Sequence, residues 1–158
     1  MRARDAAELA VQWYEAVPSR IAGGFFERHH LVRALVLLGR VDEAVAALAF
    51  TPGTDADDPI MVALRGVLAA RQGRREQADE ADRRLAGMTT PELRPMVTMQ
   101  RVRLKLALDQ RASALALFRG AATRSEVVRS LLGNDIHCDP LFDALRGQPE
   151  FERVNRGL

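Results

Sequence analysis

Apolar residues recur at spacings of three and four along most of this chain, which predicts a succession of amphipathic helices. In the first stretch, the apolar positions that predict one buried helical face over 4–17 are Ala6, Leu9, Ala10, Trp13, Tyr14 and Val17. Pro18, Gly39 and Gly73 interrupt the apolar stretches, as helix-breaking residues do. No stretch shows the strict alternation that is typical of a strand. We therefore expect an all-α fold.

The breaks between apolar stretches set the expected helix boundaries. Helices are expected over about 4–17, 25–38, 42–50, 59–72, 74–86 and 95–108, then one that ends near 122, one over 125–132, and two short segments after 139. Three aspartates, Asp42, Asp58 and Asp139, are expected to act as N-caps of the segments that follow them. Asp109 stands where glycine ends other helices, and aspartate tolerates the left-handed backbone region better than most residues.

A self-similar period near 34 residues runs through the chain. Glycine or aspartate recurs at steps of 34, 34 and 36, and an alanine follows each of them five positions later. These pairs are Asp5 and Ala10, Gly39 and Ala44, Gly73 and Ala78, and Asp109 and Ala114. Four positions further on, three registers carry a large apolar residue (Tyr14, Leu48 and Phe118), whereas the remaining one carries Asp82. This periodicity predicts stacked antiparallel helical hairpins.

The segment from Gly39 to Ala44 (GRVDEA) resembles the turn and second helix of tetratricopeptide repeats, in which a glycine precedes a small buried alanine by five positions. Other residues that match packing positions of that family are Leu31, Leu35, Ala114, Phe118 and Ala121, whereas Arg65 and Asp82 depart from its apolar pattern. The resemblance covers about 5–122. It implies a right-handed α-solenoid, with a half repeat over 1–18 and hairpins over about 25–50, 58–87 and 95–122.

The tail of the chain carries a second resemblance. The segment from Asp139 to Gly147 (DPLFDALRG), followed by Pro149 and Phe151, is similar to the ending of many bacterial tetratricopeptide proteins, which closes the end of the solenoid. The resemblance therefore implies repeats over 1–128 and a C-terminal helical cap over 129–158.

In the tetratricopeptide family, the first helix of each hairpin lines the concave face. The residues that this register places in a groove are Phe26, His29, Arg33, Val36, Leu37, Ile60, Ala63, Val67, Ala70, Arg71, Met99, Arg103, Leu106 and Ala107. Arg33, Arg71 and Arg103 are expected to be partly solvated along an otherwise apolar channel. Guanidinium groups there suit carboxylates, including the C-terminus of a peptide. The alternative is that they are partly exposed arginines with no ligand.

The charge pattern bears on the class of partner. The net charge of the 158-residue chain is +2, and its basic residues are 22 arginines and Lys105, interleaved with acidic residues. An Ala/Arg-rich, Lys-poor composition is typical of GC-rich bacteria. We expect no nucleic acid partner, because that would need a concentrated basic stripe. We also expect no membrane partner and a cytoplasmic location, because no apolar run approaches about 20 residues and no signal peptide is evident.

Candidate catalytic and metal-binding groups are few. His29 and His30 are adjacent and point about 100° apart on a helix, so they do not suit one metal ion. His137, Cys138 and Asp139 form a lone triplet without a second ligand cluster, and an N-cap role for Asp139 explains it better. A catalytic function would require Cys138 and His137 to form a buried pair in a cleft. We expect no metal, no cofactor and no catalysis.

These observations favour a non-catalytic scaffold or adaptor that binds a protein or peptide, one that is acidic or has a free C-terminus. The alternative is a C-terminal sensory or regulatory domain of a larger bacterial signalling or transcription-regulatory protein. The half repeat over 1–18, which lacks a preceding partner helix, favours this alternative.

Overall fold

The computed structural model of the protein describes residues 3–16, 25–49, 58–88, 90–122 and 139–155. Its elements are α1 (Ala3–Ala16), α2 (Phe25–Leu37), α3 (Val41–Ala49), α4 (Pro59–Arg71), α5 (Arg75–Gly87), α6 (Arg94–Ala107), α7 (Arg111–Ala122), the 3-10 helix η1 (Pro140–Leu145) and α9 (Pro149–Asn155). These ranges contain no strand, which confirms the all-α prediction for them. The helix expected over 125–132 lies outside the described residues.

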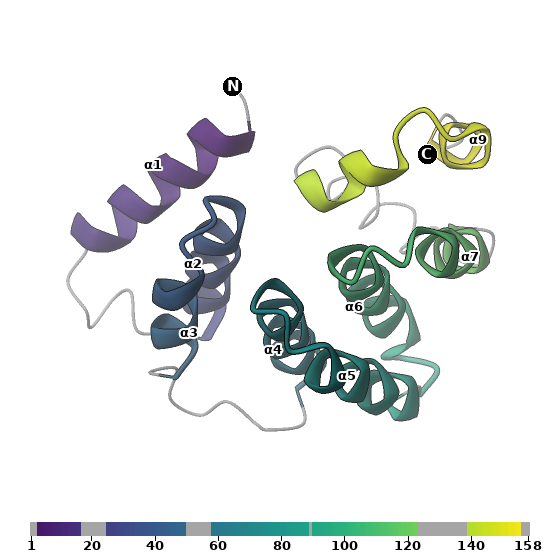
Figure 1. The fold of residues 1–158 in the computed structure, drawn as a ribbon, viewed down its shortest axis with the longest axis horizontal. Coiled ribbons are helices and arrows are strands. Elements are labelled where there is room, and N and C mark those ends of the chain that lie inside the picture. Colours follow the sequence, from purple (N-terminus) through teal and green to yellow (C-terminus); the bar gives the residue numbers. More distant parts are fainter. Residues whose placement is uncertain (1–2, 17–24, 50–57, 89, 123–138, 156–158) are drawn as a thin grey trace.

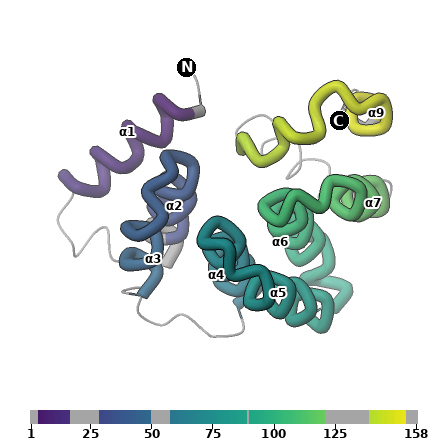
Figure 2. Tube along the Cα trace, in the orientation of Figure 1, coloured from purple at the N-terminus to yellow at the C-terminus, as the bar shows by residue number. Residues whose placement is uncertain are grey.

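The helices pack as neighbouring pairs in chain order (Figure 1). Three-residue turns join α2 to α3, α4 to α5 and α6 to α7, so the members of each pair are antiparallel. The first helices of the pairs also contact one another, α2 with α4 and α4 with α6, and α6 contacts η1. Figure 2 shows these first helices on the inner side of the curved chain of helices, with α3, α5 and α7 outside them.

The turns inside the three hairpins share one backbone geometry. Gly39, Gly73 and Asp109 all have a positive φ, of 75°, 74° and 57°. In each turn the amide of the next residue donates a hydrogen bond to the carbonyl five residues earlier, at 2.9, 2.8 and 2.8 Å. This bond satisfies a carbonyl at the end of the first helix, and it requires the left-handed conformation at the turn residue. The prediction that Asp109 takes the place of a glycine is confirmed.

The N-cap predictions have different outcomes. The Asp58 carboxylate accepts hydrogen bonds from the amides of Ile60, at 2.9 Å, and Met61, at 3.1 Å, so its predicted N-cap role is confirmed. For Asp42 the prediction is wrong, because α3 begins at Val41 and Asp42 lies inside its first turn. The turn after Gly39 is so tight that the backbone carbonyl of Arg40 already accepts the first helical bond, at 3.0 Å.

The small residues of the period lie at helix contacts. Ala44, Ala78 and Ala114 are all fully buried, and a small side chain at each point lets the paired helices approach closely. Phe118, four positions after Ala114, is fully buried too. Asp82 occupies the corresponding place in α5 and is also buried, so this polar exception to the pattern is a packing position as well.

The predicted buried face of α1 is wrong for Leu9 and Trp13, whereas Ala6, Ala10 and Tyr14 are partly buried and Val17 lies outside the described residues. Ala7 and Val11 are buried, whereas Leu9 is 55% exposed and Trp13 is 50% exposed. Helical residues two positions apart point about 200° away from each other, so these two pairs lie on nearly opposite sides. Of its neighbours, α1 packs chiefly against α2, and this contact buries a narrow face that carries Ala7 and Val11, with Ala10 partly buried beside them.

The C-terminal elements cover one side of the last hairpin. Phe142, Leu145 and Phe151 are fully buried in one cluster with Phe118 of α7. The ring centroid of Phe118 lies 6.5 Å from that of Phe142 and 5.2 Å from that of Phe151. The tail is therefore part of the hydrophobic core, although Leu141 is only partly buried.

Candidate binding cavity

A cavity of about 290 Å³ lies among α2, α4, α6 and the start of η1. Its apolar lining consists of Val36, Leu37, Ile60, Ala63, Leu64, Val67, Met96, Met99 and Leu141. Its polar lining consists of His29, Arg33, Arg71, Gln100, Arg103 and Asp139. A mostly apolar hollow with a few convergent polar groups is the usual form of a ligand site.

Helical periodicity explains why these side chains converge. Ile60, Ala63, Val67 and Arg71 are spaced by three or four residues and therefore share one face of α4. The same spacing places lining residues on one face of α2 and on one face of α6. Because α2 contacts α4 and α4 contacts α6, these faces line the same space.

The structure brings ten of the fourteen candidate groove residues around this cavity. These ten are His29, Arg33, Val36, Leu37, Ile60, Ala63, Val67, Arg71, Met99 and Arg103. Leu106 is not among them, because α7 and the tail cover that part of α6 and bury it in their cluster. Ala70 and Ala107 pack instead against the core formed by α4, α5 and α6. The side chain of Phe26 lies outside the described residues. That the cavity binds a ligand stays a prediction.

The lining also includes five residues that the candidate set omits. Met96 follows Ile60 by 36 residues and precedes Met99 by one helical turn, so its place in the lining could have been predicted from the repeat register. Leu64 and Gln100 lie at the margin of the lining faces, each one position after a predicted residue. Asp139 and Leu141 come from the tail, and no periodicity in the chain places the tail across the cavity.

Asp139 connects three parts of the fold. Its Oδ2 accepts a hydrogen bond from Nε of Arg103 at 3.1 Å and from Nη2 of Arg33 at 3.5 Å. Its Oδ1 accepts from the Leu141 amide at 3.1 Å, so the predicted N-cap role of Asp139 is confirmed. Arg103 also donates to Oε1 of Gln100, at 3.4 Å. The carboxylate of Asp139 thus holds the start of η1 against both α2 and α6.

This arrangement corrects the expectation for the three arginines. Arg103 is buried, with a side chain only 9% exposed, and is not partly solvated as expected. The Arg33 side chain is 29% exposed, and it binds the same internal carboxylate. Arg71 is exposed, and its side chain forms no ion pair or hydrogen bond with another described residue. Its guanidinium group therefore lies open to solvent at the edge of the cavity.

The histidine pair is divided between the cavity and the surface. His29 is buried on the cavity wall and His30 is exposed, with their ring centroids 4.0 Å apart. Within the described ranges, no group of three or more His, Cys, Asp or Glu side chains is placed to hold a metal ion. His137 and Cys138 lie outside the described residues.

The helices in the described part of the chain are each too short or too polar to span a bilayer. In comparisons with known proteins, no family model matches the chain, and neither a curated protein nor a solved structure does. The resemblance to tetratricopeptide repeats therefore rests on the residues of the chain itself.

Proposed function

We propose that the protein is a non-catalytic tetratricopeptide-like scaffold, whose hairpins form a right-handed α-solenoid closed by the C-terminal tail. Three features support this architecture: the three hairpins share one turn geometry, small alanines lie at the contacts within them, and their first helices contact one another. Such repeat architectures use a surface made by successive first helices to bind partners.

The observation that carries the proposal is a cavity lined by all three first helices, apolar inside, with the open Arg71 guanidinium at its edge. An apolar side chain of a partner protein enters the cavity, and a carboxylate beside that side chain pairs with Arg71. A volume of about 290 Å³ is just below the usual range for ligand sites, about 300–1,000 Å³. The cavity therefore takes one anchor residue or a chain end, and the rest of the partner lies outside it.

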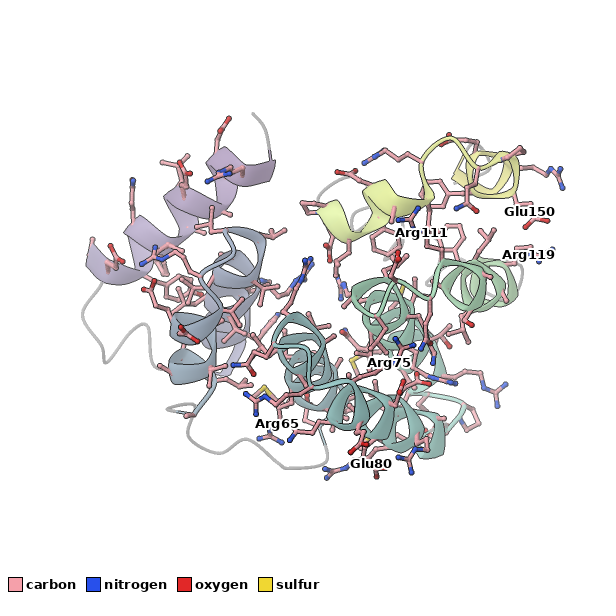
Figure 3. All side chains as sticks on the ribbon, viewed as in Figure 1. Arg65, Arg75, Glu80, Arg111, Arg119 and Glu150 are labelled. Atoms are coloured by element: carbon pink, nitrogen blue, oxygen red, sulfur yellow. The ribbon has the colours of Figure 1, made fainter. Side chains whose placement is uncertain are left out.

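Capture from a lysate of the native host, followed by mass spectrometry, tests this proposal. Wild type is compared with Ile60→Glu, which places a charge in the apolar lining, and with Arg65→Glu, which changes an exposed residue of α4 outside the lining (Figure 3). We expect at least one protein to be retained by wild type and by Arg65→Glu and lost with Ile60→Glu. If every captured protein is retained equally by all three, the cavity is not the binding site.

A second candidate function is a sensory or regulatory domain that binds a small molecule in the same cavity, as part of a larger bacterial signalling or transcription-regulatory protein. It is favoured by Asp139 and Leu141, which close one side of the cavity and suit a small ligand better than a continuous peptide. Native mass spectrometry of the purified protein would detect such a ligand as a fixed added mass. That mass should be absent from Ile60→Glu and present in Arg65→Glu.

A further inference from the structure

The ion pairs of Asp139 join segments that are far apart in the chain. Arg33 lies 106 residues before Asp139, and Arg103 lies 36 residues before it. All three residues are part of the cavity wall, and the Asp139 side chain is only 7% exposed. A carboxylate of the chain itself is therefore already bound between two guanidinium groups of the cavity wall, and it occupies a second anion site besides Arg71 at the edge.

We propose that Asp139 is an internal competitor for this anion site. A ligand with an anionic group inside the cavity, in addition to any group that pairs with Arg71 at its edge, must displace the Asp139 carboxylate from Arg33 and Arg103. The inference rests on the proposed function, in which the cavity binds a ligand. It adds a selectivity: anionic apolar ligands compete with Asp139, whereas uncharged apolar ligands do not.

The contact with Arg33 is the one that a ligand can reach first. Its 3.5 Å separation exceeds the usual range of about 2.7–3.2 Å for N–H···O hydrogen bonds, and charge-assisted bonds between arginine and carboxylate are typically about 2.7–2.9 Å. Arg33 is also more exposed than Arg103, with 29% against 9% of the side chain accessible. An external carboxylate can therefore approach Arg33 from solvent and form a shorter bond than Asp139 does.

Displacement of Asp139 does not require the tail to leave the core. The tail is anchored by Phe142, Leu145 and Phe151, which are fully buried against α6 and α7. These contacts are apolar and separate from the ion pairs of Asp139. Among the described residues, the start of η1 has to move, and the hydrogen bond that Asp139 accepts from the Leu141 amide has to break.

The test compares two naphthalene dyes that differ in charge: the anionic dye 1-anilinonaphthalene-8-sulfonate and the uncharged dye prodan. Their fluorescence is titrated against wild type and against Asp139→Asn, which removes the charge and keeps a side chain that caps helices well. Asp143→Asn is the matched control, because Asp143 is an exposed residue of the same 3-10 helix and pairs with Arg146 at 2.6 Å.

We expect Asp139→Asn to bind the anionic dye about tenfold more tightly than wild type, because the guanidinium groups of Arg33 and Arg103 lose the negative charge that Asp139 provides. The affinity for prodan should stay the same, and Asp143→Asn should change neither affinity. Adding Arg33→Gln to Asp139→Asn should remove much of the gain. Asp139→Ser, which also retains a capping oxygen, should reproduce the gain with a different side chain.

Several results would overturn the inference. An equal gain for both dyes would mean that the substitution only loosens the cavity. No gain for the anionic dye with either variant, although prodan binds wild type and not Ile60→Glu, would reject the competition and leave the proposed function intact. Failure of wild type and of every variant to bind either dye would reject both the competition by Asp139 and the proposed ligand-binding function of the cavity. If Asp139→Asn and Asp139→Ser are both unfolded by circular dichroism, Asp139 is a structural ion pair and the inference is wrong.

Discussion

Gly66 of α4 lies directly against Leu104 of α6, because a β-carbon on Gly66 would stand 2.9 Å from Cδ2 of Leu104 and 3.0 Å from its Cδ1. The same β-carbon would also stand 2.8 Å from Cβ of Ala81 in α5. Three helices therefore meet at a point where no side chain fits. Glycine in a helix interior is otherwise unfavourable by about 1 kcal/mol relative to alanine.

This contact predicts that Gly66→Ala destabilises the protein by about 1–3 kcal/mol, since the overpacked helices must shift apart. Gly120→Ala is the control, because a β-carbon on Gly120 of α7 meets nothing within 4 Å. The control should be neutral or stabilising, by up to about 1 kcal/mol, because alanine favours the helix. Urea denaturation of both variants measures the effect. Equal midpoints for both would show that α4, α5 and α6 do not meet at Gly66.

The second prediction concerns Asp82, the polar residue at an otherwise apolar position of the repeat. Asp82 accepts hydrogen bonds from Nε and Nη2 of Arg101, at 2.8 and 3.2 Å, and its Oδ2 lies 2.9 Å from Nζ of Lys105. Its side chain is only 10% exposed. Asp82→Asn should lower the free energy of unfolding by about 1–3 kcal/mol, because it leaves both cations without their counter-charge. Asp79→Asn, on the more exposed side of α5, should change it by less than about 1 kcal/mol.

The ionisation of Asp82 predicts that its contribution to the free energy of unfolding depends on pH. Burial raises the pKa of this carboxyl, but the hydrogen bonds from Arg101 and Lys105 outweigh burial, so its pKa is lowered. An unfolded aspartate has a pKa of about 3.9. The stabilisation by Asp82 is therefore complete above that value and is lost as the pH falls from there through the folded pKa. The stability difference between wild type and Asp82→Asn should accordingly shrink in acid; a difference that stays constant from pH 7 to pH 3 would contradict this.

The fold could be predicted from the sequence where local chemistry decides it. The turns at Gly39, Gly73 and Asp109 depend on which residues tolerate a positive φ, and that preference can be read from the chain itself. The buried face of α1 depends on how many neighbours the helix has. Local periodicity does not contain that information, so the prediction fails for Leu9 and Trp13.

The same limit applies to the cavity. The positions of Met99 and Val67 in the cavity wall could be predicted from the repeat register, because the register determines which face of each first helix lines the concave side. The contact between Arg33 and Asp139 could not be predicted in this way, because it joins the periodic part of the chain to a tail that lacks the period. In the sequence, Asp139 could pair with many other arginines of the chain. The position of the folded tail is what brings its carboxylate to Arg33 and Arg103.

The third prediction concerns the tail as a structural part of the core. Phe151→Ala should lower the free energy of unfolding by about 3–5 kcal/mol, because Phe151 is fully buried against Phe118. Glu150→Gln is the control: it breaks the Glu150–Arg119 ion pair of 3.4 Å on the surface (Figure 3) and should change stability by at most about 1 kcal/mol. Thermal denaturation of the two variants measures this. A Phe151→Ala protein as stable as wild type would mean that the tail is a detachable segment.

The fourth prediction concerns Arg71, the exposed guanidinium group at the edge of the cavity. Arg71→Glu should weaken binding of a partner captured through the cavity by about 3- to 10-fold at low salt, because an attraction becomes a repulsion. Arg65→Glu is a closely matched control, since it makes the same charge reversal on the same helix outside the lining. It changes the net charge equally, so long-range attraction of the partner is altered to a similar degree in both variants.

Titration at two salt concentrations separates a direct contact between Arg71 and the partner from the long-range effect of net charge. Exposed charges are screened over about 8 Å at an ionic strength of 0.15 M, so the difference between Arg71→Glu and wild type should narrow as salt is raised. Both variants should keep the wild-type circular dichroism spectrum, because both side chains are solvated. Equal weakening by Arg65→Glu would show that only net charge matters. If neither variant differs from wild type, Arg71 does not contact the partner, and the exposed face of α1 with Leu9 and Trp13 becomes the next surface to test.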